Sequence, residues 1–281
     1  MEYRELYNGV KIPMLGIGVY QVPKYEDAKQ TVLTALKAGY RLIDTAQSYM
    51  NEQAVGDAIK ESGIPREEIF ITTKLWIQDF SYDGAIEAAE RSMQRLGVDY
   101  IDLLLLHQPM GDYINAWKGL EKLYKDGKLK AIGMANCYPH VLVDLCETFE
   151  IKPMVNQVEM HPFFQQQLNV DTMNEYGVVP EAWAPFDEGL RNIFQNPILV
   201  QIGQKYGKTA AQVALRWNIQ LGVVVIPKSV HEERIKQNFD VFDFALSDED
   251  MERIKSMDIG HSEIVNHFDP QWIKALHAWK F

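Results

Sequence analysis

The chain has 281 residues, of which 47% are hydrophobic, and this suffices for one large core, since a single α/β barrel commonly takes about 250 residues. A formal net charge of −11 excludes broad non-specific binding to nucleic acid, so any bound phosphate must meet a local basic cluster. No run of about 18 apolar residues is present, and Cys137 and Cys146 have neither metal-type nor disulfide-framework spacing, so we expect a cytoplasmic protein with no membrane partner.

The first predicted element is a β-hairpin at residues 1–13, in which Asn8-Gly9 supplies the turn. Eight short apolar runs with strand character follow it along the chain: 15–20, 40–46, 69–75, 100–107, 129–136, 154–160, 178–184 and 223–229. Amphipathic segments with a helical repeat separate them, and an additional one at 208–222 precedes the last run. Several of these segments end in glycine, as helices often do: Gly39, Gly63, Gly97 and Gly127.

This repeated strand–helix unit predicts a barrel. Successive runs are mostly spaced by roughly 25–32 residues, the size of one βα unit. Eight such units predict an α/β fold of the closed (β/α)8 TIM-barrel type, with residues 1–281 as a single domain. A doubly wound sheet is the alternative, and it would normally have fewer strands and a topological switch point. We expect the hairpin to cap the N-terminal mouth of the barrel and the aromatic-rich tail, residues 260–281, to lie over the active-site face.

Four polar residues stand where strand-like runs end. Asp44 and Tyr49 come at the end of the second run, Lys74 at the end of the third and His107 at the end of the fourth. The carboxyl ends of parallel strands meet at one face of a barrel, so these side chains should converge there. A carboxylate, a phenol, an ammonium and an imidazole in contact can form a proton donor with a shifted pKa.

Five motifs of this chain resemble those of the aldo-keto reductases and occur in the same order: GYRLIDTAxxYxNE, ITTKLW, LLLLHQP, NQVExHP and IPKSVxxERIKxN. The resemblance covers essentially the whole chain and is closest to the bacterial branch that includes 2,5-diketogluconate and methylglyoxal reductases. It implies a (β/α)8 barrel that transfers hydride from NADPH to an aldehyde or ketone. It also implies a small-molecule carbonyl substrate, a monomer and a reaction that needs no metal.

The resemblance implies that Tyr49 is the proton donor of this reaction. An unperturbed tyrosine has a pKa of about 10, and a neighbouring Lys74 ammonium should bring the pKa of Tyr49 toward about 7. Asp44 should keep Lys74 charged, because a lysine buried alone tends to lose its proton. His107 should hydrogen-bond the substrate carbonyl, orient it and help to stabilise the developing alkoxide.

The nicotinamide site is not a Rossmann fingerprint, because Gly16 and Gly18 lack the third glycine of that motif. Asn136 and Gln157 would offer amide groups to the carboxamide, and Trp183 would stack on the ring. The residues that the resemblance places around this part of NADPH are Gly18, Val19, Tyr20, Asp44, Asn136, Gln157 and Trp183. Ala135 stands where the family usually has a serine, so one hydroxyl contact is missing.

The phosphate site is expected in the last motif. Lys228 and Ser229 end the eighth run, and Arg234 follows in the next helix. A cation, a hydroxyl and a guanidinium fork suit a dianionic 2′-phosphate, which favours NADPH over NADH. Asn238, one helical turn beyond Arg234, matches the adenine contact of the family.

The substrate wall is expected to be aromatic. Tyr20, Trp76, Phe80 and His107 would surround the carbonyl, and loop residues after 186 and the C-terminal tail would complete the wall. Such a wall predicts shape-based selectivity for small carbonyl compounds.

Two other functions are compatible with parts of the sequence. One is a cofactor-binding regulatory subunit with negligible turnover, and the intact set of four polar strand-end residues argues against it. The other is a metal-dependent barrel hydrolase, and the absence of the HxH pair of such enzymes argues against it. The hydrolase would use four residues: Asp44, His107, Glu159 and His161.

Overall fold

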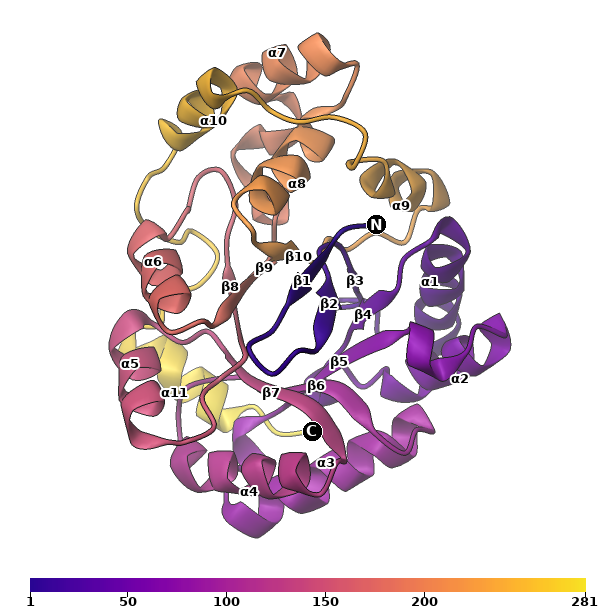
Figure 1. The fold of residues 1–281 in the computed structure, drawn as a ribbon, viewed down its shortest axis with the longest axis vertical. Coiled ribbons are helices and arrows are strands. Elements are labelled where there is room, and N and C mark those ends of the chain that lie inside the picture. Colours follow the sequence, from indigo (N-terminus) through magenta and orange to yellow (C-terminus); the bar gives the residue numbers. More distant parts are fainter.

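Eight parallel strands lie side by side in sequence order and form the centre of the computed structural model, which describes all 281 residues (Figure 1). No strand of this sheet pairs out of sequence order, so the doubly wound alternative is wrong. The strands are β3 (Ile17–Gly18), β4 (Leu42–Asp44), β5 (Phe70–Leu75), β6 (Ile101–Leu106), β7 (Leu129–Ala135), β8 (Val155–Glu159), β9 (Val179–Trp183) and β10 (Val224–Val225).

The first and last strands meet, so that the sheet curls round to close on itself. Gly16 N donates to Val225 O at 2.8 Å, beside a parallel bridge between the two segments. Both strands are shorter than the predicted runs at 15–20 and 223–229. In the last run Pro227 has no N–H with which to continue the ladder.

Helices cover the outside of the sheet (Figure 1). They are α1 (Tyr25–Ala38), α2 (Glu52–Ser62), α3 (Tyr82–Leu96), α4 (Tyr113–Lys125), α5 (Pro139–Thr148), α6 (Gln167–Glu175), α7 (Pro197–Tyr206), α8 (Ala210–Gln220), α9 (Glu232–Phe239), α10 (Asp248–Lys255) and α11 (Pro270–Ala278). The 3-10 segments are η1 (Gln47–Tyr49), η2 (Arg66–Glu68), η3 (Ile77–Asp79) and the irregular η4 (Asp187–Gln195). The four glycines predicted at helix ends all have positive φ, the conformation that closes a helix: Gly39, Gly63, Gly97 and Gly127.

The N-terminal hairpin lies across the N-terminal end of the barrel, in the middle of Figure 1. It consists of β1 (Tyr3–Glu5) and antiparallel β2 (Lys11–Pro13). The Tyr7 hydroxyl donates to Lys152 O at 2.7 Å, and Asn8 Nδ2 donates to Lys130 O at 3.0 Å. These carbonyls belong to segments that lead into β8 and begin β7, so the hairpin spans the barrel mouth, as predicted.

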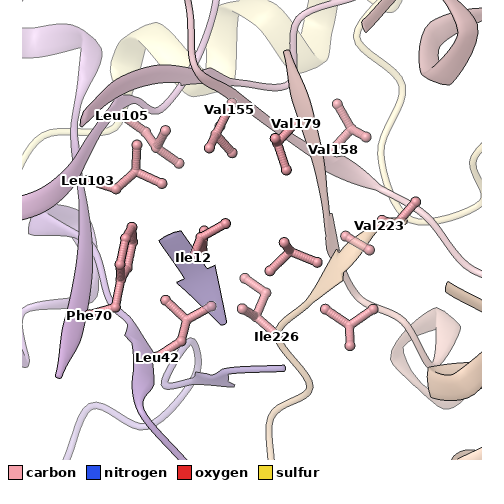
Figure 2. Packing of buried hydrophobic residues seen from close by; sticks show 14 of the residues in the cluster. Ile12, Leu42, Phe70, Leu103, Leu105, Val155, Val158, Val179, Val223 and Ile226 are labelled. Carbon is pink, nitrogen blue, oxygen red and sulfur yellow. The ribbon is translucent and has the colours of Figure 1, made fainter. Parts of the chain in front are cut away.

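The barrel interior changes from apolar to polar along the strands. Figure 2 shows Ile12 of the hairpin among Leu42, Phe70 and Leu103, which are inward-facing residues of β4, β5 and β6. Side chains two positions apart on a strand share a face. The residues two and four positions beyond Leu42, Phe70 and Leu103 therefore also face inward, but nearer the C-terminal end. Asp44 and Lys74 occupy two of these positions. Their side chains therefore face the barrel interior near the C-terminal ends of the strands.

The C-terminal segment contains α11 and packs on the loop that follows β5. Trp76 Nε1 donates to Trp279 O at 3.0 Å, and Gln78 Nε2 donates to Phe281 O at 3.2 Å. The last residues thus lie on the loop that follows β5.

None of the helices combines the length and the apolar content needed to cross a membrane.

Candidate active site

Asp44 and Lys74 form a buried ion pair at the carboxyl ends of two neighbouring strands. Lys74 Nζ lies 2.6 Å from Asp44 Oδ1, and their side chains are 0% and 2% exposed. Burial opposes the charged form of Lys74, but Asp44 and Tyr49 together raise its pKa above the ordinary value. This direction of the pKa shift favours the ammonium form of Lys74 at neutral pH.

The three N–H groups of this ammonium have three acceptors. Besides Asp44, Lys74 Nζ donates to Thr45 O at 3.1 Å and to the Tyr49 hydroxyl oxygen at 3.2 Å. An ammonium has three hydrogens and no lone pair, so it cannot accept the proton of Tyr49. The O–H of Tyr49 is consequently free to point away from Lys74 toward the opening of the barrel.

Burial holds Tyr49 in its protonated form. Loss of solvation raises the pKa of Tyr49 to about 12, although the Lys74 ammonium acts in the opposite direction. The prediction that Lys74 brings the pKa of Tyr49 toward neutrality is therefore wrong for this structure. The sequence reveals the charged neighbour, but it does not reveal how far the phenol is removed from water.

His107 follows β6 and lies against the same group. Its ring centroid is 5.7 Å from that of Tyr49 and 5.1 Å from that of Trp76, and both rings meet it edge-on. Its Nδ1 faces the Ser48 hydroxyl at 3.5 Å, which leaves Nε2 without a protein partner. Burial, and secondarily the Lys74 ammonium, lower the pKa of His107 well below its ordinary value, so the imidazole is neutral.

Asn136 and Trp183 are joined to each other and to His107. Trp183 Nε1 donates to Asn136 Oδ1 at 2.9 Å, and Asn136 Nδ2 donates to His107 O at 3.0 Å. Asn136 has a left-handed φ of 61°, which asparagine tolerates better than most residues. An amide has two donors and two lone pairs, so Asn136 keeps one hydrogen and one lone pair for a ligand.

Gln157 is more restricted than the sequence suggests. Its Nε2 donates to Asp44 Oδ2 at 2.8 Å and to Glu181 Oε2 at 3.0 Å. Both amide hydrogens are therefore engaged by carboxyl groups, and only Oε1 remains for a ligand. Of the amide group that the sequence assigned to the carboxamide, only the oxygen of Gln157 is therefore available.

Glu181 is a buried carboxyl group that sequence reasoning missed. It lies on β9 opposite Gln157 and is 0% exposed. The signal was present in the predicted run at 178–184, where a charged residue stands inside an apolar strand. Such a residue is almost never fully buried without a partner, so its position in the run marked it for attention.

The loop after β3 brings Tyr20 to this group. The rings of Tyr20 and Tyr49 have centroids 5.0 Å apart, and Tyr20 is 43% exposed. Gly18 and Val19 are buried, and Val19 N donates to Asp44 O at 3.1 Å. The predicted nicotinamide and proton-donor residues therefore adjoin one another.

The predicted phosphate residues follow β10 and lie on α9, next to the predicted nicotinamide residue Gly18, whose N–H donates to Pro227 O at 3.1 Å. Lys228 and Arg234 are exposed, and neither forms an ion pair with an acidic side chain. Ser229 is buried, and its hydroxyl accepts from His231 N at 3.2 Å. Asn238 is buried on α9. Two exposed cations outside any ion pair, one of them followed in sequence by a serine, are residue types suited to a phosphate.

Trp76 and Phe80, two of the residues predicted for the aromatic wall, flank η3 and are both buried. Trp76 also stacks edge-on against Trp279, with ring centroids 5.1 Å apart, and lies 6.5 Å from the ring of Phe281. The particular tail residues that meet Trp76 were not predicted, because no local pattern indicates where a distant segment will pack.

The four residues that a metal-dependent hydrolase would use do not form one metal-binding group. Asp44 is engaged by Lys74, and His161 Nε2 lies 3.0 Å from Glu159 Oε1 and 3.3 Å from Asp187 Oδ1. No group of three or more His, Cys, Asp and Glu side chains in the structure is arranged to hold a metal ion.

Comparisons with known proteins agree with the geometry. Residues 14–259 match the Aldo/keto reductase family. The glyoxal reductase of Bacillus subtilis (strain 168) is 49% identical over 254 residues, which are 90% of this chain and 91% of that protein.

Solved structures give the same result. An aldo-keto reductase from a Medee basin deep-sea metagenome library has a TM-score of 0.92 and 45% identity, covering 95% of this chain and 98% of that one. A Bombyx mori aldo-keto reductase in complex with NADP has a TM-score of 0.90 and 31% identity, covering 95% of each chain.

Proposed function

Since this chain belongs to the aldo/keto reductase family, we propose that it reduces small aldehydes and ketones to alcohols with NADPH, with Tyr49 as the proton donor. The observation that carries the proposal is the arrangement of hydrogen bonds around Lys74. Lys74 Nζ donates its three hydrogens to Asp44, Thr45 and Tyr49 and has no lone pair. It therefore cannot accept the proton of Tyr49, which stays available for a substrate.

The residues fit a nicotinamide dinucleotide phosphate. Lys228 and Arg234 are exposed and belong to none of the ion pairs of the structure, although Glu188 is near enough to feel the charge of Lys228, and Ser229 follows Lys228 in the sequence. Gln157 Oε1 is an acceptor, and Asn136 retains a donor and an acceptor, which together suit a carboxamide. The relative in complex with NADP supports the same cofactor.

When bound, NADPH supplies a hydride for the carbonyl carbon. His107 Nε2 orients the carbonyl oxygen by a hydrogen bond, and this bond strengthens as negative charge develops there. Tyr49 then gives its proton to the same oxygen. Lys74 stabilises the phenolate that remains, and Asp44 keeps Lys74 charged throughout.

A pKa of about 12 for Tyr49 is compatible with this role. The alkoxide formed by reduction is a stronger base than a phenolate, so the proton transfer is downhill without any lowering of the tyrosine pKa. A high pKa also ensures that nearly every enzyme molecule carries the proton at neutral pH.

We further propose that the chain acts as one domain and a monomer, and that residues 260–281 lie over the active-site face. Trp279 and Phe281 pack on Trp76, whose other edge meets His107, so the tail would form one wall of the substrate pocket. A wall of this kind suits small carbonyl compounds such as methylglyoxal. The similarity to a glyoxal reductase supports this substrate class.

The test is loss of reduced-nicotinamide absorbance with four carbonyl compounds: methylglyoxal, a nitrobenzaldehyde, a ketose and 2,5-diketogluconate. Wild type and Tyr49→Phe are compared, with NADPH affinity measured by tryptophan fluorescence. We expect turnover in the wild type, and a loss on the order of a thousandfold in the variant at unchanged NADPH affinity. A variant that kept more than about a tenth of wild-type turnover would remove Tyr49 from this role. NADPH binding without turnover on any carbonyl would instead favour a regulatory subunit.

A further inference from the structure

Glu181 lies in the barrel wall directly beneath the proposed nicotinamide site. It is paired in register with Gln157 of β8 and with Val224 of β10. Trp183 is two residues further along the same strand, so both side chains belong to the same face of β9. The carboxyl group therefore lies one layer below the ring on which the nicotinamide is proposed to stack.

One amide connects Glu181 to the proton-donor group. Gln157 Nε2 bonds Asp44 Oδ2 and Glu181 Oε2 at the same time, so two carboxyl groups share one neutral bridge. Each carboxyl group accepts one hydrogen of Gln157 Nε2. The orientation of the amide is thereby fixed, with Oε1 pointing away from both carboxyl groups. The other oxygen, Glu181 Oε1, is buried and has no hydrogen-bond partner. The negative charge of an ionised Glu181 would therefore be stabilised by a single hydrogen bond, from Gln157.

The charged and titratable groups around Glu181 come from four other elements. Asp44 of β4 is a like charge, while Lys74 of β5 is an opposite charge already paired with Asp44. Tyr49 and His107 meet Lys74 from η1 and the end of β6, and both are neutral. On β10 the paired residue is apolar. Burial, and then Asp44, raise the pKa of Glu181 to about 8.

The charge of a nicotinamide ring depends on its redox state, since the oxidised ring is a cation and the reduced ring is neutral. A cation beside a carboxyl group favours the carboxylate. By reciprocity, ionisation of that carboxyl group must favour binding of the cation by the same factor.

We propose that Glu181 is a charge-compensating, positioning residue that gives up its proton to solvent when the oxidised nicotinamide binds, and that it thereby makes the preference for NADP+ over NADPH depend on pH. This inference rests on the proposed function, because it requires the nicotinamide to lie against Gln157 and Trp183. No bond between heavy atoms changes. The carboxyl group loses a proton, and the charge of the ring is balanced by the resulting carboxylate.

The experiment measures the dissociation constants of NADP+ and NADPH by tryptophan fluorescence between about pH 6 and pH 9, and the number of protons released by calorimetry in buffers of different ionisation enthalpy. The ratio of the two constants removes the titration of the phosphates, which both forms of the cofactor share. Wild type is compared with Glu181→Gln. The control is Asp102→Asn, which changes a carboxyl group whose pKa is also raised by burial, but at the start of β6.

We expect the wild-type affinity for NADP+ relative to NADPH to rise on the order of tenfold over this range, with proton release on NADP+ binding only. Glu181→Gln should make the ratio constant, whereas Asp102→Asn should leave it as in the wild type. A constant ratio in the wild type, or a pH dependence that survives in Glu181→Gln, would overturn the inference. If Glu181→Gln does not fold, the wild-type proton count alone decides. Failure to bind either nucleotide is a different result, because it contradicts the proposed function as well.

Discussion

The ammonium of Lys74 lies 3.2 Å from the hydroxyl oxygen of Tyr49, yet the phenol remains protonated. Two opposing effects act on the same oxygen. Removal from water disfavours the phenolate, and the neighbouring charge favours it. Burial prevails, and it raises the pKa of Tyr49 to about 12. Lys74 therefore acts after the proton has left, by stabilising the phenolate, rather than by priming Tyr49 to lose its proton beforehand.

This relationship predicts the pH dependence of reduction. Reduction needs Tyr49 protonated, and with a pKa of about 12 the proton is lost only in strongly alkaline solution. His107 is neutral throughout, because its pKa lies well below the ordinary value. We expect kcat for reduction to show no loss from Tyr49 between about pH 6 and pH 9. The measurement uses Glu181→Gln, so that the second buried carboxyl group does not contribute. An alkaline loss of kcat centred near neutrality in that variant would contradict this assignment.

The fold was predictable because the chain repeats one unit. Apolar runs alternated with amphipathic segments, and Asn8-Gly9 marked the hairpin, so local patterns indicated β3 to β10 in order. The polar strand-end residues Asp44 and Lys74 were predictable for the same reason. Parallel strands bring their carboxyl ends together whatever the intervening helices are.

Features that depend on distant segments were not predictable. The contact of Trp76 with Trp279 joins residues far apart in sequence, and no local pattern encodes it. The sharing of Gln157 between Asp44 and Glu181 depends on the curvature that brings β4, β8 and β9 round one interior. Burial raises the pKa of Tyr49 above its ordinary value. How deeply the hydroxyl is buried depends on the packing of the whole fold, so the sequence around Tyr49 does not reveal it.

Replacement of Glu181 by glutamine should make the stability of the protein less dependent on pH. The pKa of Glu181 rises from 4.5 to about 8 on folding. The folded state therefore holds a proton that the unfolded state has lost, and stability falls as pH rises between these values. Glu181→Gln removes this loss, so its free energy of unfolding relative to the wild type should be greater at pH 9 than at pH 5 by on the order of 3–5 kcal/mol. Urea unfolding at the two pH values measures this difference. The exposed Glu67→Gln is the control, and an equal effect of both substitutions would show that Glu181 is not responsible.

Loss of the two unpaired cations should affect the phosphate-bearing cofactor selectively. Lys228→Ala combined with Arg234→Ala removes charge-assisted hydrogen bonds that only a 2′-phosphate would receive. Each such bond contributes about 1.5–3 kcal/mol, so NADPH affinity should fall by at least about tenfold to a hundredfold while NADH affinity changes little. Fluorescence titration with both cofactors measures this. Lys236→Ala on the same helix is the control, because Lys236 is exposed and already paired with Glu232. Equal losses for NADPH and NADH in the double variant would place the phosphate elsewhere.

Removal of the Trp279 side chain should enlarge the substrate pocket without disturbing the proton donor. Its indole packs on Trp76, whereas the hydrogen bond from Trp76 Nε1 goes to the main-chain carbonyl of Trp279 and survives the substitution. Trp279→Ala should therefore raise KM for small carbonyl compounds, on the order of tenfold if about 1.4 kcal/mol of packing is lost, and should change kcat much less. NADPH affinity should stay the same, because no cofactor residue contacts this ring. Steady-state kinetics on methylglyoxal measure the two constants, with the exposed neighbour Lys280→Ala as the control. An unchanged KM would mean that residues 260–281 do not form a wall of the pocket, and a fall confined to kcat would mean that the tail acts on His107 through Trp76 instead.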